Sequence, residues 1–190
     1  MKPHPARIST YIVLIFLLTI SIPAKAQDGY SEVLEKEMGT GPFAINTSKE
    51  NVHQYLFEKI CYGSSSGSLY KADPVRSGLE TYFGLKVDSI IVEFSIYRES
   101  EGAEVENIAG ITLFLQPAKD KEEENDFINS LAGHYGDPGR FWDMSVDPPV
   151  TLRWDWWCES CLLNIRTGVN DLTGKKEPYY RASYQIAYGG

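Results

Sequence analysis

The chain is short of cysteine, of basic residues and of long hydrophobic runs. Its 190 residues include only 3 Cys and 3 His, and 18 Lys and Arg stand against 26 Asp and Glu, a net charge of −8. An acidic chain is not attracted to a phosphate backbone, so we expect no nucleic acid partner. Hydrophobic residues make up 43% of the chain and aromatic residues 13%, which excludes a disordered protein.

The longest hydrophobic run lies near the N-terminus. Tyr11–Ile22 is 12 residues long, whereas a membrane-spanning helix needs about 20. Basic residues precede the run, and an A-x-A cleavage site ends at Ala26. We therefore expect that residues 1–26 are a signal peptide and that residues 27–190 form a single domain. The mature protein is expected to be periplasmic or secreted, with no membrane-spanning segment.

Two segments have the pattern of amphipathic helices. A capping box opens at Thr47, and the apolar residues after it are spaced as one helical stripe. This pattern predicts a helix over about 48–60. A second helix is predicted over about 121–135, where Asp120 opens the segment and Gly136 ends it.

The rest of the chain has the alternation of apolar and polar residues that is typical of β-strands. The fold class predicted is α+β, an antiparallel sheet with the two main helices packed on one face. The expected strands cover residues 79–85, 88–98, 108–116, 150–157, 161–167 and 180–188.

The order of these elements is the same in both halves of the chain. One helix precedes three strands in residues 46–117 and again in residues 118–190, at a nearly constant offset. This order fits a tandem α-β-β-β duplication and, equally, a single sheet without a repeat. It resembles the architecture of the β-lactamase inhibitor proteins, which small bacterial outer-membrane assembly lipoproteins also have. The resemblance implies a sheet face that meets a protein partner, and it implies no site residue.

The sharpest local motif is W-C-E-S-C, which is similar to the active site of thioredoxin-like oxidoreductases. Their chemistry needs the first cysteine at a helix N-terminus, whereas the residues on both sides of this motif have strand patterns. We therefore favour a hairpin that turns at Glu159 and Ser160, with Cys158 and Cys161 joined in a disulfide. A thiol-disulfide redox protein that uses the same two cysteines is the alternative. The third cysteine, Cys61, is free or pairs with one of them.

Aromatic residues crowd the C-terminal half, as core beneath the second helix or as a surface. Adjacent residues of a strand point to opposite faces, so Trp156 and Trp157 cannot both be core. Trp157 is therefore the first candidate for a surface contact. The full set of candidate binding residues is Trp142, Trp157, Tyr184 and Tyr188.

No nucleophile–base set, phosphate-binding loop or metal-ligand spacing stands out in the chain. The sequence therefore predicts no catalytic residue, no metal and no cofactor. We expect an exported, non-enzymatic binding, inhibitory or envelope-assembly module, which acts on a protein partner through a sheet face or aromatic loops. A carbohydrate-binding module that stacks sugars on the tryptophans is a further alternative.

Overall fold

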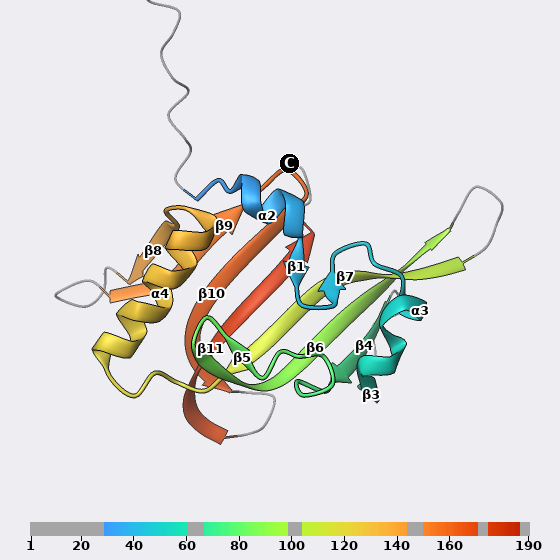
Figure 1. Cartoon of the computed structure of the whole chain (residues 1–190), viewed down its shortest axis with the longest axis horizontal. Helices are drawn as coiled ribbons and strands as arrows, with labels where there is room; N and C mark the ends of the chain where they lie inside the picture. Colours follow the sequence, from blue (N-terminus) through green and yellow to red (C-terminus); the bar gives the residue numbers. More distant parts are fainter. Residues whose placement is uncertain (1–28, 61–66, 99–103, 144–149, 171–174, 187–190) are drawn as a thin grey trace, which may run out of the picture.

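The computed structural model describes residues 29–60, 67–98, 104–143, 150–170 and 175–186, so the predicted signal peptide and Cys61 lie outside the described residues. These residues form mostly antiparallel β-sheet with a few short helices (Figure 1). The helical elements are α2 (Glu32–Glu37), α3 (Lys49–Val52), the 3-10 helix η1 (His53–Tyr55) and α4 (Lys121–Tyr135). The strands are β1 (Gly39–Thr40), β2 (Phe43–Ala44), β3 (Leu56–Ile60), β4 (Gly67–Ala72), β5 (Thr81–Tyr82), β6 (Leu85–Arg98), β7 (Glu104–Leu115), β8 (Gly139–Asp143), β9 (Val150–Trp157), β10 (Cys161–Asn170) and β11 (Lys175–Ile186).

One nine-stranded antiparallel sheet dominates the fold. Its strand order is β3-β4-β6-β7-β11-β10-β9-β8, and β5 pairs with β6 off this path. β7 and β11 are neighbours at the centre, where Tyr184 lies opposite Ile111. The first strand of each half of the chain, β3 or β8, thus lies at an outer edge, and the last strand lies in the middle.

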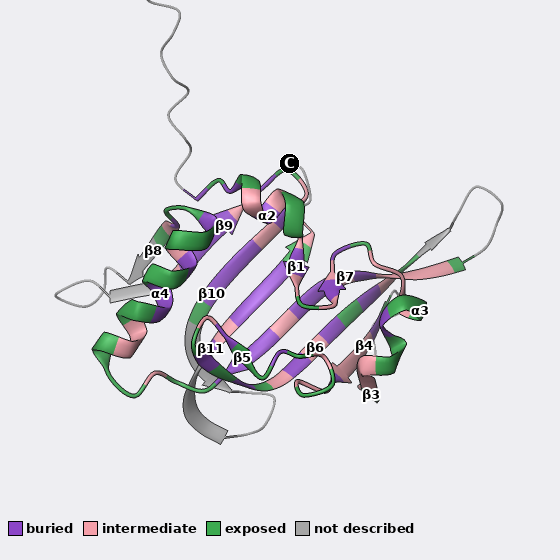
Figure 2. Ribbon diagram, in the orientation of Figure 1, coloured by how far each residue is buried: buried purple, intermediate pink, exposed green. Residues whose placement is uncertain are grey.

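Helix α4 packs on the sheet through one apolar face. The Asp120 carboxylate accepts a hydrogen bond from the Glu123 amide over 2.9 Å and caps the start of the helix. On the buried face, the Phe127 ring lies 5.9 Å from the ring of Tyr180 in β11. Figure 2 shows the buried residues gathered on the central strands and the exposed residues on the outer side of α4. The helix predicted over 121–135 is confirmed.

The helix predicted over 48–60 is wrong in its second part. Helix α3 ends at Val52, and the residues from Leu56 onward form the edge strand β3, which pairs with β4. Ser48, not Thr47, is the N-cap of α3, and its side chain forms no capping hydrogen bond. The Thr47 carbonyl accepts a hydrogen bond from the Ile108 amide of β7 over 2.9 Å. Pairing with neighbouring strands therefore outweighs a short apolar stripe, which by itself fits a helix or a strand.

The single strand predicted over 79–85 is also wrong. Residues 81–82 form β5, which folds back on the start of β6. Phe83 and Gly84, between the two strands, have φ angles of 46° and 92°. Two positive φ angles in succession are typical of a type I′ hairpin turn, so this segment is a tight hairpin. The sheet has three further strands that were not predicted, β3, β4 and β8.

These extra strands change the predicted repeat. Each half of the chain contributes four strands to the sheet path, where three were predicted. The offset between corresponding strands is not constant, because β3 and β8 begin at Leu56 and Gly139 whereas β7 and β11 begin at Glu104 and Lys175.

Candidate functional site

The half of the sheet built from β7, β9, β10 and β11 has two faces of different character. The face that α4 covers has buried apolar residues, among them Trp156, Leu163 and Tyr184. Successive residues of a strand point to opposite faces, so the residues between them form the other face, which we call the polar face. The polar face consists of Arg153, Asp155 and Trp157 of β9, Leu162, Asn164 and Arg166 of β10, Arg181, Ser183 and Gln185 of β11, and Gly110, Thr112 and Phe114 of β7.

A row of small polar side chains crosses the middle of the polar face. In register, Asn164 lies opposite both Asp155 and Ser183. Ser183 lies opposite Thr112, and their hydroxyl oxygens are 3.2 Å apart. Asp155, Asn164 and Ser183 are only 7%, 3% and 3% exposed. Polar side chains are rarely buried to this extent unless they are paired, so this row is more than a solvated surface.

Three arginines form the next row. Arg166 of β10 lies directly opposite Arg153 of β9 and Arg181 of β11. Cβ atoms of such cross-strand neighbours are about 4.5–5.5 Å apart, and like charges placed in this way destabilise a sheet. One guanidinium nitrogen of Arg153 lies 2.8 Å from the Asp155 carboxylate. We call Arg153, Arg166 and Arg181 the arginine row.

The electrostatics of the site reflect this crowding of positive charge. Burial, together with the charges of Arg153 and Arg181, lowers the pKa of Arg166. Arginine begins from so high a pKa that the guanidinium stays charged at neutral pH. Burial raises the pKa of Asp155, although the nearby Arg153 acts in the opposite direction. The site therefore has an excess of positive charge, and solvent reaches it at the exposed Arg166.

Trp157 lies at one end of the polar face and is half-buried. Its ring meets the Tyr30 ring edge-on, with 5.1 Å between the ring centroids. The backbone of Trp157 donates to the Gly29 carbonyl over 2.7 Å and accepts from the Ser31 amide over 2.9 Å. Trp156, the next residue, is fully buried on the α4 side. The prediction that Trp156 and Trp157 face opposite sides is confirmed.

The prediction that Tyr184 is a surface contact is wrong. Tyr184 is 0% exposed, and its hydroxyl lies 2.8 Å from the hydroxyl of Tyr82 and 3.0 Å from that of Tyr135. It belongs to the residues of β11 that face α4, so it is core. Trp142 lies in β8, but its side chain, like the whole of Tyr188, lies outside the described residues.

The two nearby cysteines flank a hairpin turn, as predicted. The Cys158 amide donates to the Cys161 carbonyl over 2.9 Å, and the Cys161 amide donates to the Cys158 sulfur over 3.0 Å. Strand β10 begins at Cys161, so Cys158 is not at a helix N-terminus. Both cysteines are buried free thiols in this structure, and the disulfide between them stays a prediction.

The surroundings of Cys158 disfavour a thiolate. The Glu35 carboxylate accepts hydrogen bonds from the Glu159 amide over 2.8 Å and from the Ser160 hydroxyl over 3.0 Å, which places a negative charge beside the turn. Burial, and then the hydrogen bond to Glu35, raises the pKa of Cys158 to about 11. Burial, and then the charge of Cys158, raises the pKa of Cys161 to about 12. Redox-active cysteines have lowered pKa values, so the surroundings of Cys158 and Cys161 disfavour the reactive thiolate that thiol-disulfide exchange needs.

We expect the reduced thiols to react slowly with iodoacetamide at neutral pH. The thiolate is the reactive form, and a pKa of about 11 for Cys158 leaves about one thiolate in 10⁴ at pH 7. The alkylation rate, followed by mass spectrometry, should rise steadily with pH. Glu35→Gln removes the nearby charge and should lower the pKa of Cys158, whereas Glu37→Gln in the same helix should not. A Cys158 pKa at or below 7 would contradict this prediction and would favour a thiol-disulfide redox protein.

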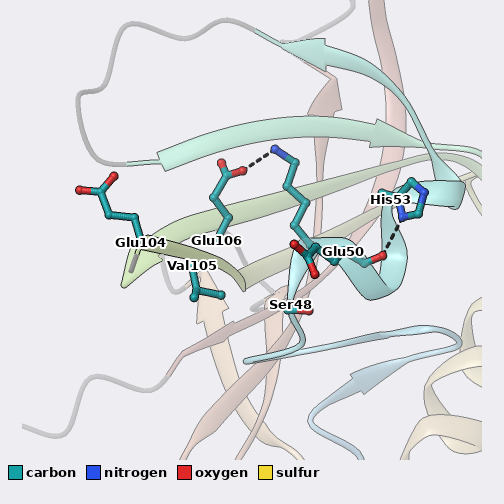
Figure 3. Close-up of a pocket in the computed structure, with 7 residues that line it drawn as sticks. Ser48, Glu50, His53, Glu104, Val105 and Glu106 are labelled. Atoms are coloured by element: carbon teal, nitrogen blue, oxygen red, sulfur yellow. Dashed lines mark hydrogen bonds and ion pairs between the residues drawn. The ribbon is translucent and has the colours of Figure 1, made fainter. Parts of the chain in front are cut away.

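A separate pocket of 840 Å³ lies between α3 and the start of β7 (Figure 3). The close-up shows Glu106 pointing toward the ammonium group of Lys49, with which it forms an ion pair. His53 lies on the other side of α3, where its Nδ1 is 2.6 Å from the Glu50 carbonyl. The lining residues are Ser48, Lys49, Glu50, His53, Glu104, Val105 and Glu106.

The ion pair in this pocket favours a structural role. The Lys49 ammonium also donates to the Tyr70 hydroxyl over 2.8 Å, and the Ser68 hydroxyl donates to Glu106 over 2.6 Å. Burial is the largest single effect and opposes a charge on both members of the pair. Their mutual hydrogen bond, the hydrogen bonds of Tyr70 and Ser68 and the attraction between the two charges together outweigh it, so the pKa of Lys49 is raised and that of Glu106 is lowered. Lys49 is thus poorly suited as a general base and Glu106 as a proton donor. We assign the pair to holding α3 on the sheet.

The described part of the chain has neither a metal-binding cluster nor a membrane-spanning helix. No three of its His, Cys, Asp and Glu side chains are grouped so that they could hold a metal ion. No helix in the same residues combines the length and the hydrophobicity that crossing a bilayer requires.

Comparisons with protein-family models, with curated proteins and with solved structures found no match to this chain. The likeness to the β-lactamase inhibitor architecture therefore rests on the order of the elements alone. Residue roles in this chain therefore follow from the geometry and chemistry of the site itself.

The arginine row is not among the site residues predicted from the sequence. One feature of the sequence points to the row: Arg153, Arg166 and Arg181 each occupy a polar position of a predicted strand. The alternation of apolar and polar residues predicts that each arginine points away from the core. It does not predict which residues of different strands lie opposite one another. The arginine row can therefore be recognised only when the register of the strands is known.

Proposed function

We propose that this chain is an exported, non-enzymatic binding module that presents its polar face to a protein partner. The observation that carries the proposal is the arginine row beside buried polar side chains. Three like charges side by side lower the stability of a sheet, and a chain of net charge −8 has ample acidic residues with which to balance them. An arrangement that costs stability and is accessible to solvent is best explained by binding.

The architecture of the sheet supports the same proposal. We propose two fused units, each a helix followed by four strands of the main sheet path, with the short strand β5 as an addition to the first unit and with α3 and α4 packed opposite the polar face. The strand order supports this arrangement, since β3-β4-β6-β7 is mirrored by β11-β10-β9-β8. In the β-lactamase inhibitor architecture, which it resembles, a sheet face meets the protein partner. That likeness concerns the fold and makes protein binding a natural use of this face.

The two alternative functions have less support. A thiol-disulfide enzyme needs a reactive thiolate, whereas burial and Glu35 raise the pKa of Cys158. A sugar-binding surface needs exposed aromatic rings, whereas Trp154 and Trp156 are buried. Trp157 is half-buried, and its ring is already in contact with Tyr30.

Site-specific photocrosslinking tests the proposed function. Gln185 is exposed on the polar face, and Asp126 is exposed on α4. Benzoylphenylalanine in place of Gln185 should give one discrete protein adduct when cells that produce the chain are irradiated. The same group in place of Asp126 should give none, because α4 lies on the other side of the sheet.

Two results would contradict the proposal. One is the absence of an adduct from Gln185. The other is the same set of adducts from both positions, which would indicate nonspecific collisions. Both variants replace exposed residues, so both should fold, and a far-ultraviolet circular dichroism spectrum checks this.

A further inference from the structure

Acidic residues on the polar face do not balance the arginine row. Asp155 pairs with Arg153, and within the described ranges it is also the acidic group whose charge acts on Arg166. Among the described residues, Arg166 and Arg181 form no ion pair. Glu93 of β6 lies on the same side of the sheet, but it faces Gly110 rather than an arginine. In the part of the chain that the structure describes, Arg166 and Arg181 therefore carry two positive charges that no ion pair balances.

The same cluster contains polar atoms without partners. Among the described residues, Oδ1 of Asp155, Oδ1 of Asn164 and Nε of Arg181 are buried and have no hydrogen-bond partner. Nearly all buried polar atoms in folded proteins are paired, and an unpaired one lowers stability. Two of these atoms need a donor and one needs an acceptor. The cluster is therefore incomplete by itself.

We propose that the arginine row binds an acidic segment of the protein partner, whose carboxylates lie against Arg166 and Arg181. This inference rests on the proposed function and specifies the chemistry of the partner. A planar guanidinium group forms paired hydrogen bonds with a carboxylate, and the surplus of positive charge attracts a negative segment to this face.

The unpaired atoms favour a peptide over a small anion. Phosphate or sulfate offers mainly acceptors, which suit the arginines and leave Asp155 and Asn164 unpaired. A peptide segment offers carboxylate acceptors together with backbone N–H donors. Both Oδ1 atoms are covered in the unbound protein, so a peptide donor reaches them only after neighbouring side chains move.

Peptide binding to the purified protein tests this inference. The probe is a fluorescein-labelled, glutamate-rich peptide, its reference is a glutamine-rich peptide of the same length, and fluorescence anisotropy is the readout. We expect the glutamate peptide to bind more tightly and its affinity to fall as salt is added. Arg166→Gln should weaken binding about tenfold, because it removes a charged hydrogen-bond donor. Arg166→Lys should weaken binding less, since it keeps the charge and loses the planar fork.

Arg140→Gln is the matched control. Arg140 is exposed on β8 and lies opposite Trp154, which belongs to the α4 side of the sheet. The variant removes the same charge from the chain without touching the polar face. Equal losses from Arg140→Gln and Arg166→Gln would show a nonspecific effect of net charge and overturn the inference.

Three further outcomes would also overturn it. Equal affinity for the glutamate-rich and glutamine-rich peptides would exclude recognition of carboxylate side chains. Inorganic phosphate that binds as tightly as the glutamate peptide would indicate a small-anion site. If the purified chain sediments as a dimer and Arg166→Gln dissociates it, the polar face binds a second copy of this chain and not an acidic segment of another protein.

The crosslinking experiment separates this inference from the proposed function. If the Gln185 adduct forms and persists in full yield in Arg166→Gln, protein docking stands and recognition of an acidic segment is wrong. If no adduct forms in the parent chain, the proposed function itself is wrong. Loss of the adduct together with loss of peptide binding supports both.

Discussion

Replacing Trp156 by alanine is expected to lower the free energy of unfolding by about 3–5 kcal/mol. The side chain is 0% exposed, and its indole N–H donates to the Gly136 carbonyl over 2.6 Å. Its ring lies 6.3 Å from the ring of Tyr135. Because Gly136 ends α4, this one side chain fixes the C-terminal end of the helix to the sheet. The variant loses apolar contacts and also the hydrogen bond that joins the sheet to the end of the helix.

Urea titration followed by circular dichroism measures this loss, with Trp157→Ala as its control. The two tryptophans are adjacent, but Trp157 is half-buried on the polar face. Trp157→Ala removes less buried surface than Trp156→Ala, so we expect a clearly smaller loss of stability. If the Trp157 variant were destabilised as much as the Trp156 variant, the assignment of the two residues to opposite faces would be wrong.

Removing the hydroxyl group of Tyr184 is expected to cost about 1–3 kcal/mol of stability, although phenylalanine fills nearly the same volume. The hydroxyl lies between those of Tyr82 and Tyr135, at 2.8 Å and 3.0 Å. Burial raises the pKa of Tyr184, so the three groups form a network of neutral hydroxyls. Tyr184→Phe takes away the central member and leaves two buried hydroxyl groups with fewer partners.

Tyr180→Phe is the matched control, measured in the same urea titration. Tyr180 is in the same strand and faces the same helix, but its hydroxyl is bonded to Glu124 near the surface. Water can replace that partner, so the loss should be smaller. Unchanged stability of Tyr184→Phe would show that the tyrosine network contributes little to folding.

Several local features were predictable from the sequence because each depends on a pattern within one segment. The cap at Asp120 and the apolar stripe after it determine α4. Alternation in 150–157 predicted both the strand β9 and the opposite directions of Trp156 and Trp157. The hairpin between the two cysteines followed in the same way from two strand patterns with a short turn between them.

The errors fall where a segment has more than one possible partner. The stripe before Ile60 fits a helix, but pairing with β4 makes its second part a strand. The apolar residues of 79–85 fit a strand, but the positive φ angles at Phe83 and Gly84 fold them into a hairpin. The alternation in β11 does not show which face of the strand is buried. Tyr184 is core because α4 packs on its face of the sheet.

Alternation along each strand predicts which of its residues point away from the core, because that property repeats every two residues within a single segment. It placed Arg153, Arg166 and Arg181 on polar positions. That the three lie in one row, beside Asp155 and Asn164, follows from the pairing of the strands in the folded sheet. The physical reason is that backbone hydrogen bonds between strands set the register, and these bonds join residues that the sequence alone does not pair.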